Sequence, residues 1–266
     1  MYDKFNRKIN YLRVSVTDRC NLRCVYCMPA EGVELMHHND ILRFEEIVEV
    51  VEYAVTQGVD KIRITGGEPL VKKGIIDLIR MIGKIEGIKD FGMTTNGIFL
   101  DKYAQQLADA GLHRVNISLD TMNPEKYHRI TRLGDINQVF KGIEAAKKAG
   151  LTPIKINCVV KKSFDEPDAK DVAEFCKKHS LQIRYINEMN LETGSFAVVN
   201  GGTGGNCSIC NRLRLTANGD IMPCLFSDLR FNVRELGIKK AFEFAIGEKP
   251  KSGHVAKKSQ FYSIGG

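Results

Sequence analysis

Six of the eight cysteines in this 266-residue sequence fall into two groups of three, which indicates metal or redox chemistry. The first group lies in TDRCNLRCVYCMP, residues 17–29, where Cys20, Cys24 and Cys27 form a C-x3-C-x2-C pattern. A closed structural zinc site takes four protein ligands, and the next cysteine along the chain is Cys158. A [4Fe–4S] cluster held by three cysteines instead keeps one iron open for a ligand from outside the protein.

An iron left open in this way could hold the amino and carboxylate groups of S-adenosylmethionine. An electron from the cluster could then cleave the sulfonium and give a 5′-deoxyadenosyl radical. The spacing, with the aromatic Tyr26 directly before the last cysteine, resembles the signature of the radical-SAM superfamily. The sequence GGEP at residues 66–69 strengthens this resemblance, because in that superfamily the motif contacts the methionyl amino group. Structural zinc is the alternative interpretation.

The second group of cysteines has a C-x2-C-x13-C pattern and consists of Cys207, Cys210 and Cys224. Two interpretations stay open: a zinc site closed by a histidine such as His254, or a second [4Fe–4S] cluster whose free iron binds substrate. Between these cysteines, Arg212 and Arg214 lie two apart, so in a strand both would face the same side. Two guanidiniums on one face suit a phosphate or a purine edge, although a solvated strand face is the plainer alternative.

The elements that must position these residues alternate between short β-branched runs and longer helical patterns, which predicts an α/β fold with a parallel sheet. Six strands are expected, at residues 11–16, 61–65, 91–96, 114–120, 153–160 and 182–189. In RFEEIVEVVEYAVTQG, residues 43–58, apolar positions share one helix face, and Gly58 stands where a C-cap belongs. About six βα units could form a doubly wound sheet or a partial barrel. No GxGxxG follows the first strand, whereas the unusual residues do follow strands, as they do in barrel enzymes.

After residue 190 the alternation of strand and helix patterns ends. We therefore divide the chain into a barrel at residues 1–190 and a C-terminal region at residues 191–266. The stretch NGGTGG, residues 200–205, is typical of a glycine-rich linker. The stretch RLRLTANGDIMPCL, residues 212–225, predicts a β-hairpin with Asn218-Gly219 at the turn. The tail KPKSGHVAKKSQFYSIGG is polar and is expected to be irregular.

The composition is that of an ordinary globular protein with a formal net charge of +7. This charge suits an anionic ligand such as a nucleotide, although a mildly basic surface would also explain it. The sequence shows no block of like charges, no apolar N-terminal signal segment and no stretch apolar enough to span a membrane. We therefore expect a cytoplasmic protein without disulfides, nucleic-acid partners or a membrane contact.

Several motifs together narrow the family resemblance. They are LRVSVTDRCNLRCVYCMP, RITGGEPL, TTNG, NISLD, CNRLRLTANGDIMPCLFSD and the C-terminal IGG. From about residue 10 to 190, and again from 206 to the end, the chain resembles the GTP 3′,8-cyclases, radical-SAM enzymes that open molybdenum cofactor biosynthesis. The resemblance implies a partial (βα)6 TIM-type barrel with a C-terminal extension, and two [4Fe–4S] clusters at its two ends. It also implies that the radical takes the ribose 3′ hydrogen of GTP and that the ribose carbon then attacks carbon 8 of guanine.

The same resemblance implies roles for individual residues. Cys20, Cys24 and Cys27 would hold the first cluster, and Cys207, Cys210 and Cys224 a second one that holds the guanine. The positions that would contact S-adenosylmethionine are Tyr26, Gly66, Gly67, Glu68, Ser118 and Met189. The positions that would contact GTP are Arg13, Arg63, Thr94, Lys155, Arg212 and Arg214. The terminal Gly265 and Gly266 would insert into the active site and support catalysis; a frayed tail is the alternative.

Partners follow from the family as well. It implies a one-electron donor such as a flavodoxin or ferredoxin and a downstream cyclic pyranopterin monophosphate synthase, and it allows a homodimer. Independently of the family, Arg13, Arg63 and Lys155 lie within expected strands, where an inward-pointing cation needs a partner. A triphosphate is one such partner, and salt bridges in the core are the alternative.

One departure from the family lies between Met189 and Cys207, where only seventeen residues intervene. The cyclases have a much longer segment there, which helps to wall the substrate cavity. A paralogue that acts on another nucleotide or on a peptide is therefore the second hypothesis. A non-enzymatic protein with two zinc sites is the third, and it leaves GGEP unexplained.

Overall fold

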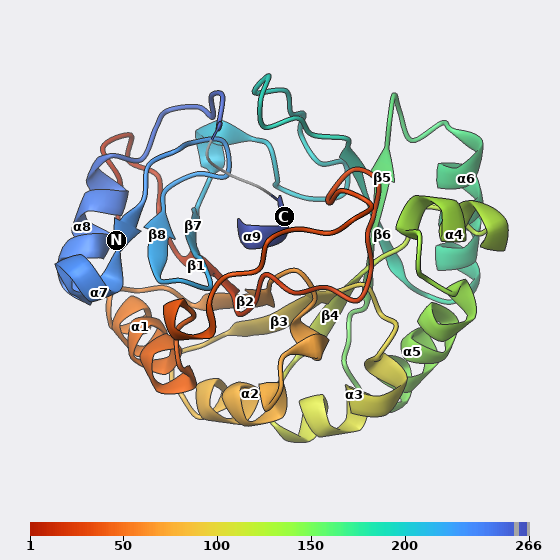
Figure 1. The fold of residues 1–266 in the computed structure, drawn as a ribbon, viewed down its shortest axis with the longest axis horizontal. Coiled ribbons are helices and arrows are strands. Elements are labelled where there is room, and N and C mark those ends of the chain that lie inside the picture. Colours follow the sequence, from red (N-terminus) through yellow and green to blue (C-terminus); the bar gives the residue numbers. More distant parts are fainter. Residues whose placement is uncertain (258–260, 265–266) are drawn as a thin grey trace.

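The computed structural model describes residues 1–257 and 261–264, and in these residues nine strands form one sheet (Figure 1). Their order is β6-β5-β4-β3-β2-β1-β7-β8-β9, and every pairing from β6 to β7 is parallel. The first six strands are β1 (Tyr11–Ser15), β2 (Lys61–Thr65), β3 (Asp90–Thr95), β4 (Arg114–Ser118), β5 (Lys155–Val160) and β6 (Gln182–Asn187). All six lie where the sequence predicts them.

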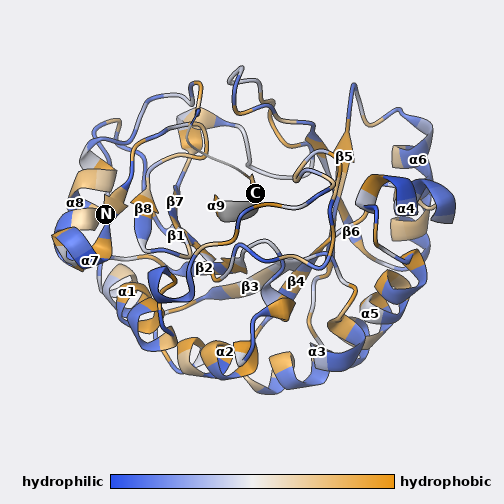
Figure 2. Ribbon diagram, viewed as in Figure 1, coloured by the Kyte–Doolittle hydropathy of each residue, from blue (hydrophilic) through white to orange (hydrophobic). Residues whose placement is uncertain are grey.

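The six helices that follow β1 to β5 cover the outer face of this curved sheet (Figure 1). They are α1 (Phe44–Thr56), α2 (Ile75–Gly83), α3 (Leu100–Asp109), α4 (Pro124–Thr131), α5 (Ile136–Lys148) and α6 (Pro167–Lys178). Each buries an apolar stripe, as Ile47, Val50, Val51 and Ala54 do in α1. The helical ribbons accordingly alternate between hydrophobic and hydrophilic residues (Figure 2). A one-sided helical layer on an arc of parallel strands is a partial barrel, so the doubly wound alternative is wrong.

The barrel has five βα units followed by a sixth strand, rather than the six units expected. After β6 the chain forms no helix before the short turn η3 (Cys207–Ile209), and residues 188–206 instead fold back toward the barrel mouth. Asn200 pairs with Tyr185 of β6 through two backbone hydrogen bonds, of 3.0 and 3.1 Å. NGGTGG is therefore part of the folded structure, and its interpretation as a linker is wrong.

The C-terminal region extends the same sheet on the β1 side. It adds β7 (Arg212–Leu215), β8 (Asp220–Met222) and β9 (Phe231–Asn232), followed by α7 (Val233–Leu236), α8 (Ile238–Gly247) and α9 (Phe261–Ile264). Strand β7 runs parallel to β1, and β7 and β8 form the predicted antiparallel hairpin with Gly219 at a positive φ of 96°. The division at residue 190 stays a prediction.

The tail differs from expectation because α9 is helical and lies inside the arc of strands (Figure 1). Ile264 is buried with Leu191, Met222, Phe226 and Ala256, in a small apolar cluster separate from the main core. Gly265 and Gly266 lie outside the described residues. In the described part of the chain, no helix combines the length and the apolar character needed to cross a bilayer.

Candidate active site

The first cysteine triad lies on the loop after β1, at the edge of the sheet where the parallel strands end. It lines a cavity of about 210 Å³ together with the ends of β2, β4 and β6. The six residues expected to contact S-adenosylmethionine all line this same cavity: Tyr26, Gly66, Gly67, Glu68, Ser118 and Met189. The structure therefore brings the two predicted sets together in one place.

Burial changes the chemistry of these thiols. It raises the pKa of Cys20 to about 11 and that of Cys27 to about 12, and it also raises the pKa of Cys24. Without bound iron, the three cysteines are therefore protonated at neutral pH, and ligation by iron would release their protons. Three sulfur donors in one cavity fit an iron–sulfur cluster in chemical type.

The GGEP segment makes close backbone contacts with the cysteine loop. Gly67 N–H donates to Thr17 O at 2.8 Å, and Glu68 N–H donates to Arg19 O at 2.8 Å. A Cβ on Gly67 would lie 2.4 Å from Arg19 O, which no side chain tolerates. Glycine is thus required here because the backbone next to Cys20 lies against it.

Glu68 is buried and fastens this loop to the end of β3. Its Oε1 accepts hydrogen bonds from Thr95 Oγ1 at 2.7 Å and from Leu70 N–H at 3.1 Å, and its Oε2 accepts one from Asn96 N–H at 2.7 Å. Burial raises the pKa of Glu68 to about 7, although these hydrogen bonds oppose the shift. Both carboxylate oxygens therefore serve to hold the protein loop.

Asp120, which the sequence reasoning missed, orients Tyr26. The Tyr26 hydroxyl donates to Asp120 Oδ2 at 2.7 Å, while Asp120 Oδ1 accepts from Val159 N–H at 2.8 Å. Burial raises the pKa of Asp120 to about 6. The motif NISLD contains this aspartate just after β4, which is a signal that could have identified it.

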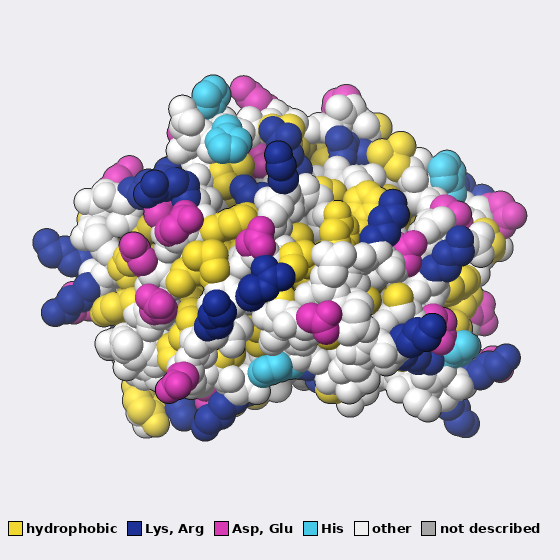
Figure 3. Space-filling view, turned by 90° about the horizontal axis from the view of Figure 1, so that it is seen from below, with side chains coloured by type: hydrophobic (Ala, Val, Ile, Leu, Met, Phe, Trp, Pro, Cys, Tyr) yellow, Lys and Arg dark blue, Asp and Glu magenta, His cyan; other side chains and the backbone are white. Residues whose placement is uncertain are grey.

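The second cysteine triad lines another cavity, of about 380 Å³, on the β7 side of the barrel. Among the described residues that line it, eight are cations and Asp90 is the only carboxylate. The cations are Arg13, Lys61, Arg63, Arg114, Lys155, Arg184, Arg212 and Arg214. On the outer face seen in Figure 3, by contrast, Lys and Arg are interspersed with Asp and Glu. An excess of buried positive charge indicates a polyanionic ligand.

Five of the six residues expected to contact GTP line this cavity, including the pair on β7. Thr94 is the exception, because it lines the first cavity with the cysteines. Burial and the neighbouring Arg184 lower the pKa of Lys155 to about 8, and burial lowers the pKa of Arg214 to about 9. Arg114, which the sequence analysis did not single out, forms a salt bridge of 2.5 Å with Asp90.

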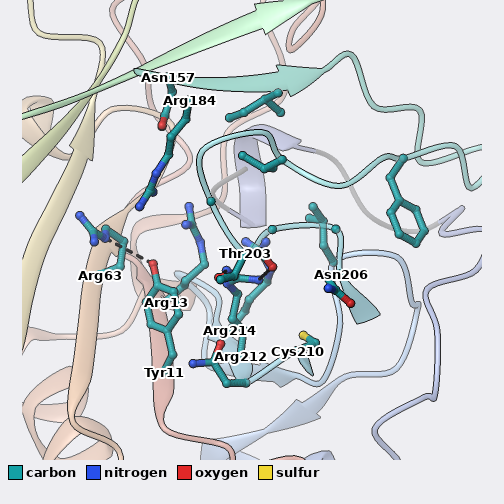
Figure 4. A pocket seen from close by; sticks show the side chains of 18 of the residues that line it. Tyr11, Arg13, Arg63, Asn157, Arg184, Thr203, Asn206, Cys210, Arg212 and Arg214 are labelled. Carbon is teal, nitrogen blue, oxygen red and sulfur yellow. Dashed lines mark hydrogen bonds between the residues drawn. The ribbon is translucent and has the colours of Figure 1, made fainter. Parts of the chain in front are cut away.

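Tyr11 lies among the arginines of this cavity, next to Arg13 and Arg63 (Figure 4). Arg63 Nε donates to the Tyr11 hydroxyl at 3.3 Å, and the Arg212 guanidinium lies 5.5 Å from the centre of the Tyr11 ring. Burial alone would raise the pKa of Tyr11, but the guanidiniums of Arg13, Arg63 and Arg212 lower it to about 7. Tyr11 precedes Arg13 by two positions in β1, and this alternation could have placed it in the cavity.

The glycine-rich segment forms one wall of the second cavity. Arg212 donates to Thr203 Oγ1 at 2.8 Å and to Thr203 O at 3.3 Å. Gly205 has a φ of 75°, and a Cβ there would lie 2.0 Å from Ala197 O, so the tight loop requires glycine. The short segment between Met189 and Cys207 thus lines the cavity in this chain (Figure 4).

The two cavities adjoin, because Asn157, Ile186 and Met189 line both. Phe261 of α9 lines the first cavity, so the helix that precedes the terminal glycines lies at the site. His254, the suggested zinc ligand, is exposed and is absent from the described residues that line the second cavity. Cys158 and Cys176, the two cysteines outside the triads, are buried in the main core.

Comparison with known proteins places this geometry in context. The family model for the radical SAM superfamily matches residues 14–176. A GTP 3′,8-cyclase of Thermodesulfovibrio yellowstonii is 42% identical over 282 positions, which cover 89% of this chain and 88% of the relative. A GTP 3′,8-cyclase of Clostridium botulinum is 40% identical over 319 positions, which cover 100% of both chains. Because this chain has 266 residues, at least 53 of those positions hold residues of the relative alone, in agreement with a shortened segment.

Among solved structures, Streptococcus suis SuiB bound to S-adenosylmethionine has a similar fold. It aligns with a TM-score of 0.64 at 18% identity over 86% of this chain. The chain spans 64% of that structure's own length. This similarity supports the barrel architecture described above.

Proposed function

Because the chain belongs to the radical SAM superfamily and, within it, to the GTP 3′,8-cyclase family, we propose that it cyclises GTP. A 5′-deoxyadenosyl radical derived from S-adenosylmethionine would take the hydrogen from the ribose 3′ carbon, and that carbon would then bond to carbon 8 of guanine. One electron and one proton would complete the product, which is an isomer of GTP. The observation that carries the proposal is the pair of adjoining cavities that share Asn157, Ile186 and Met189. One holds a cysteine triad and the other an excess of cations, so a radical formed in the first can reach a nucleotide bound in the second.

In the first cavity, Cys20, Cys24 and Cys27 would hold a [4Fe–4S] cluster, which supplies the electron that cleaves S-adenosylmethionine. The residues proposed to bind this cosubstrate are Tyr26, Gly66, Gly67, Glu68, Ser118 and Met189. Two contacts support their placement. Asp120 holds the Tyr26 hydroxyl, and Gly67 lies against the backbone of Arg19, next to the first cysteine.

In the second cavity, the cations bind the triphosphate and orient the ribose toward the first cavity. Arginine suits this task, because its planar guanidinium can donate two hydrogen bonds to one phosphate. The proposed contacts are Arg13, Arg63, Lys155, Arg212 and Arg214, with Thr94 on the side of the cosubstrate. We add Lys61, Arg184 and Tyr11 to this set, because they line the same cavity. The wall formed around Thr203 helps to exclude water from the radical chemistry.

The second triad, Cys207, Cys210 and Cys224, would hold a second [4Fe–4S] cluster that binds the guanine. The donor set fits, because three thiols line the same cavity as the nucleotide cations. The placement of α9 supports a role for Gly265 and Gly266 at the active site. The reaction also needs a one-electron donor such as a flavodoxin or ferredoxin and a synthase that consumes the cyclic product; a homodimer stays a prediction.

The test is an anaerobic assay of the full chain, reconstituted with iron and sulfide and supplied with S-adenosylmethionine, dithionite and GTP. We expect 5′-deoxyadenosine whose formation depends on GTP, together with a new isomer of GTP detected by mass spectrometry. Cys24→Ala should abolish both products, because it removes a proposed ligand of the first cluster. If 5′-deoxyadenosine forms while GTP stays unchanged, GTP is not the substrate.

A further inference from the structure

Lys249 is a buried lysine next to the second cysteine triad, and the mechanism above does not use it. Its side chain is 1% exposed, although lysine is almost never fully buried without a partner. Its ammonium donates to Arg212 O at 2.7 Å and to Pro223 O. Arg212 follows Cys210 by two residues and Pro223 directly precedes Cys224, so Lys249 joins the two chain segments that carry these cysteines.

The ammonium lies beside the segments that carry Cys210 and Cys224, because its two acceptor carbonyls belong to residues within two positions of those cysteines. Among the residues that the structure describes, no carboxylate forms an ion pair with Lys249. A buried cation needs a counter-charge, and a cluster ligated by Cys210 and Cys224 would supply it.

Arg7 completes the arrangement from the N-terminal turn. Its Nε donates to Asp3 Oδ2 at 2.6 Å, a buried pair that fixes the guanidinium. Its Nη1 donates to Cys207 O at 2.7 Å, and its Nη2 donates to Pro250 O at 2.7 Å. Arg7 therefore ties the remaining cysteine of the triad to the segment that begins with Lys249.

We propose that Arg7 and Lys249 form a two-cation clamp that holds the second triad in place, and that Lys249 stabilises the reduced form of its cluster. This inference rests on the second cluster proposed above. The reduced cluster carries one more negative charge than the oxidised one. A buried ammonium beside two of its ligands favours that charge, because the effective dielectric constant is low there. Lys249 is thus a positioning residue that acts on the cluster through its ligands.

Two substitutions separate the charge of Lys249 from its hydrogen bonds. Lys249→Gln can keep a hydrogen bond to a carbonyl while it removes the charge, and Lys249→Met removes both. Lys240→Gln is the matched control, because it removes an exposed lysine from the helix that leads to Lys249. All three are made in the full chain carrying Cys20→Ala, Cys24→Ala and Cys27→Ala, so that only the second triad can hold a cluster.

Each protein is reconstituted anaerobically with iron and sulfide, and the reduction potential is measured by dithionite titration followed by electron paramagnetic resonance. Lys249→Gln should shift the potential to a more negative value, and Lys249→Met should in addition lose iron to a chelator several-fold faster. Lys240→Gln should match the parent in both readouts. Circular dichroism checks that each variant is folded, and Lys249→Gln decides the question if Lys249→Met does not fold.

Two results would overturn the inference in distinguishable ways. If the parent with the second triad alone takes up no cluster, the proposed second cluster and the clamp both fail. If the parent holds a cluster and folded Lys249→Gln has the same potential and iron retention, the clamp alone fails. Neither result depends on turnover of GTP.

Discussion

Substituting Gly67 by alanine should separate the GGEP loop from the first cysteine loop. The new Cβ would lie 2.4 Å from Arg19 O, 2.7 Å from Arg19 C and 2.8 Å from Asp18 O. All three are backbone atoms, so a rotamer change cannot relieve the overlap and one of the two loops must move. Overpacking of this kind costs about 1–3 kcal/mol of the free energy of unfolding.

For a chain of this size, that cost should lower the melting temperature by about 2–12 °C. The measurement is thermal unfolding of the protein before reconstitution, followed by iron analysis after it. Because Arg19 directly precedes Cys20, the displaced loop should also reduce iron uptake by the first triad. Gly247→Ala is the matched control, since a Cβ there meets nothing within 4 Å and the position does not have a positive φ.

The reasoning is refuted if Gly67→Ala melts at the wild-type temperature and takes up iron normally. That outcome would mean that the two loops move apart without cost. Equal losses in Gly67→Ala and Gly247→Ala would refute it as well, because only one of the two glycines is closely packed.

The other predictions concern the nucleotide cavity and the loop that Glu68 holds. Arg214→Ala should weaken GTP binding by about 10- to 150-fold, which corresponds to the loss of about 1.5–3 kcal/mol from hydrogen bonds to a charged group. Isothermal titration calorimetry measures this affinity. An unchanged affinity would show that Arg214 does not face the nucleotide. The lowered pKa of Tyr11, about 7, means that a phenolate forms in the cavity as pH rises through that value, so GTP affinity at constant salt should fall there. Tyr11→Phe should remove that part of the pH dependence, and an identical profile in both proteins would contradict it. Glu68→Gln replaces one acceptor oxygen of the carboxylate by an amide donor, which would face the N–H and O–H groups that now donate to Glu68. We expect it to lower the free energy of unfolding by about 1–3 kcal/mol, measured by thermal unfolding. An unchanged melting temperature would show that other contacts hold the loop.

The sequence was sufficient for the barrel strands, because hydrophobic runs in a parallel sheet are continuous and their ends are marked by turn residues. The predicted cosubstrate and substrate residues were grouped by the family resemblance, and all of them except Thr94 line the cavity expected for their group. Thr94 is the exception. The family resemblance predicted a contact with GTP, but Thr94 lies near the end of β3 and lines the cavity of the first cysteine triad.

Other features depend on contacts between distant segments, which no local pattern records. The stretch NGGTGG has the composition of a linker, but Thr203 holds Arg212 and Asn200 pairs with β6. Asp120 and Lys249 likewise gain their roles from partners far away in the chain. The tail was expected to be irregular, yet α9 packs its Ile264 against Leu191 and Phe226.

The central place of β1 in the sheet has a consequence for how the protein is made. The second neighbour of β1 is β7, which pairs Tyr11 with Arg212 and is translated about 200 residues after β1. At about 5–20 residues per second, the nascent chain carries an open strand edge for roughly 10–40 s. The charged Arg13 lies on that edge, and charge on an exposed strand opposes pairing with other chains. The arginine proposed to bind the nucleotide in the finished enzyme would thus also oppose aggregation of the unfinished sheet.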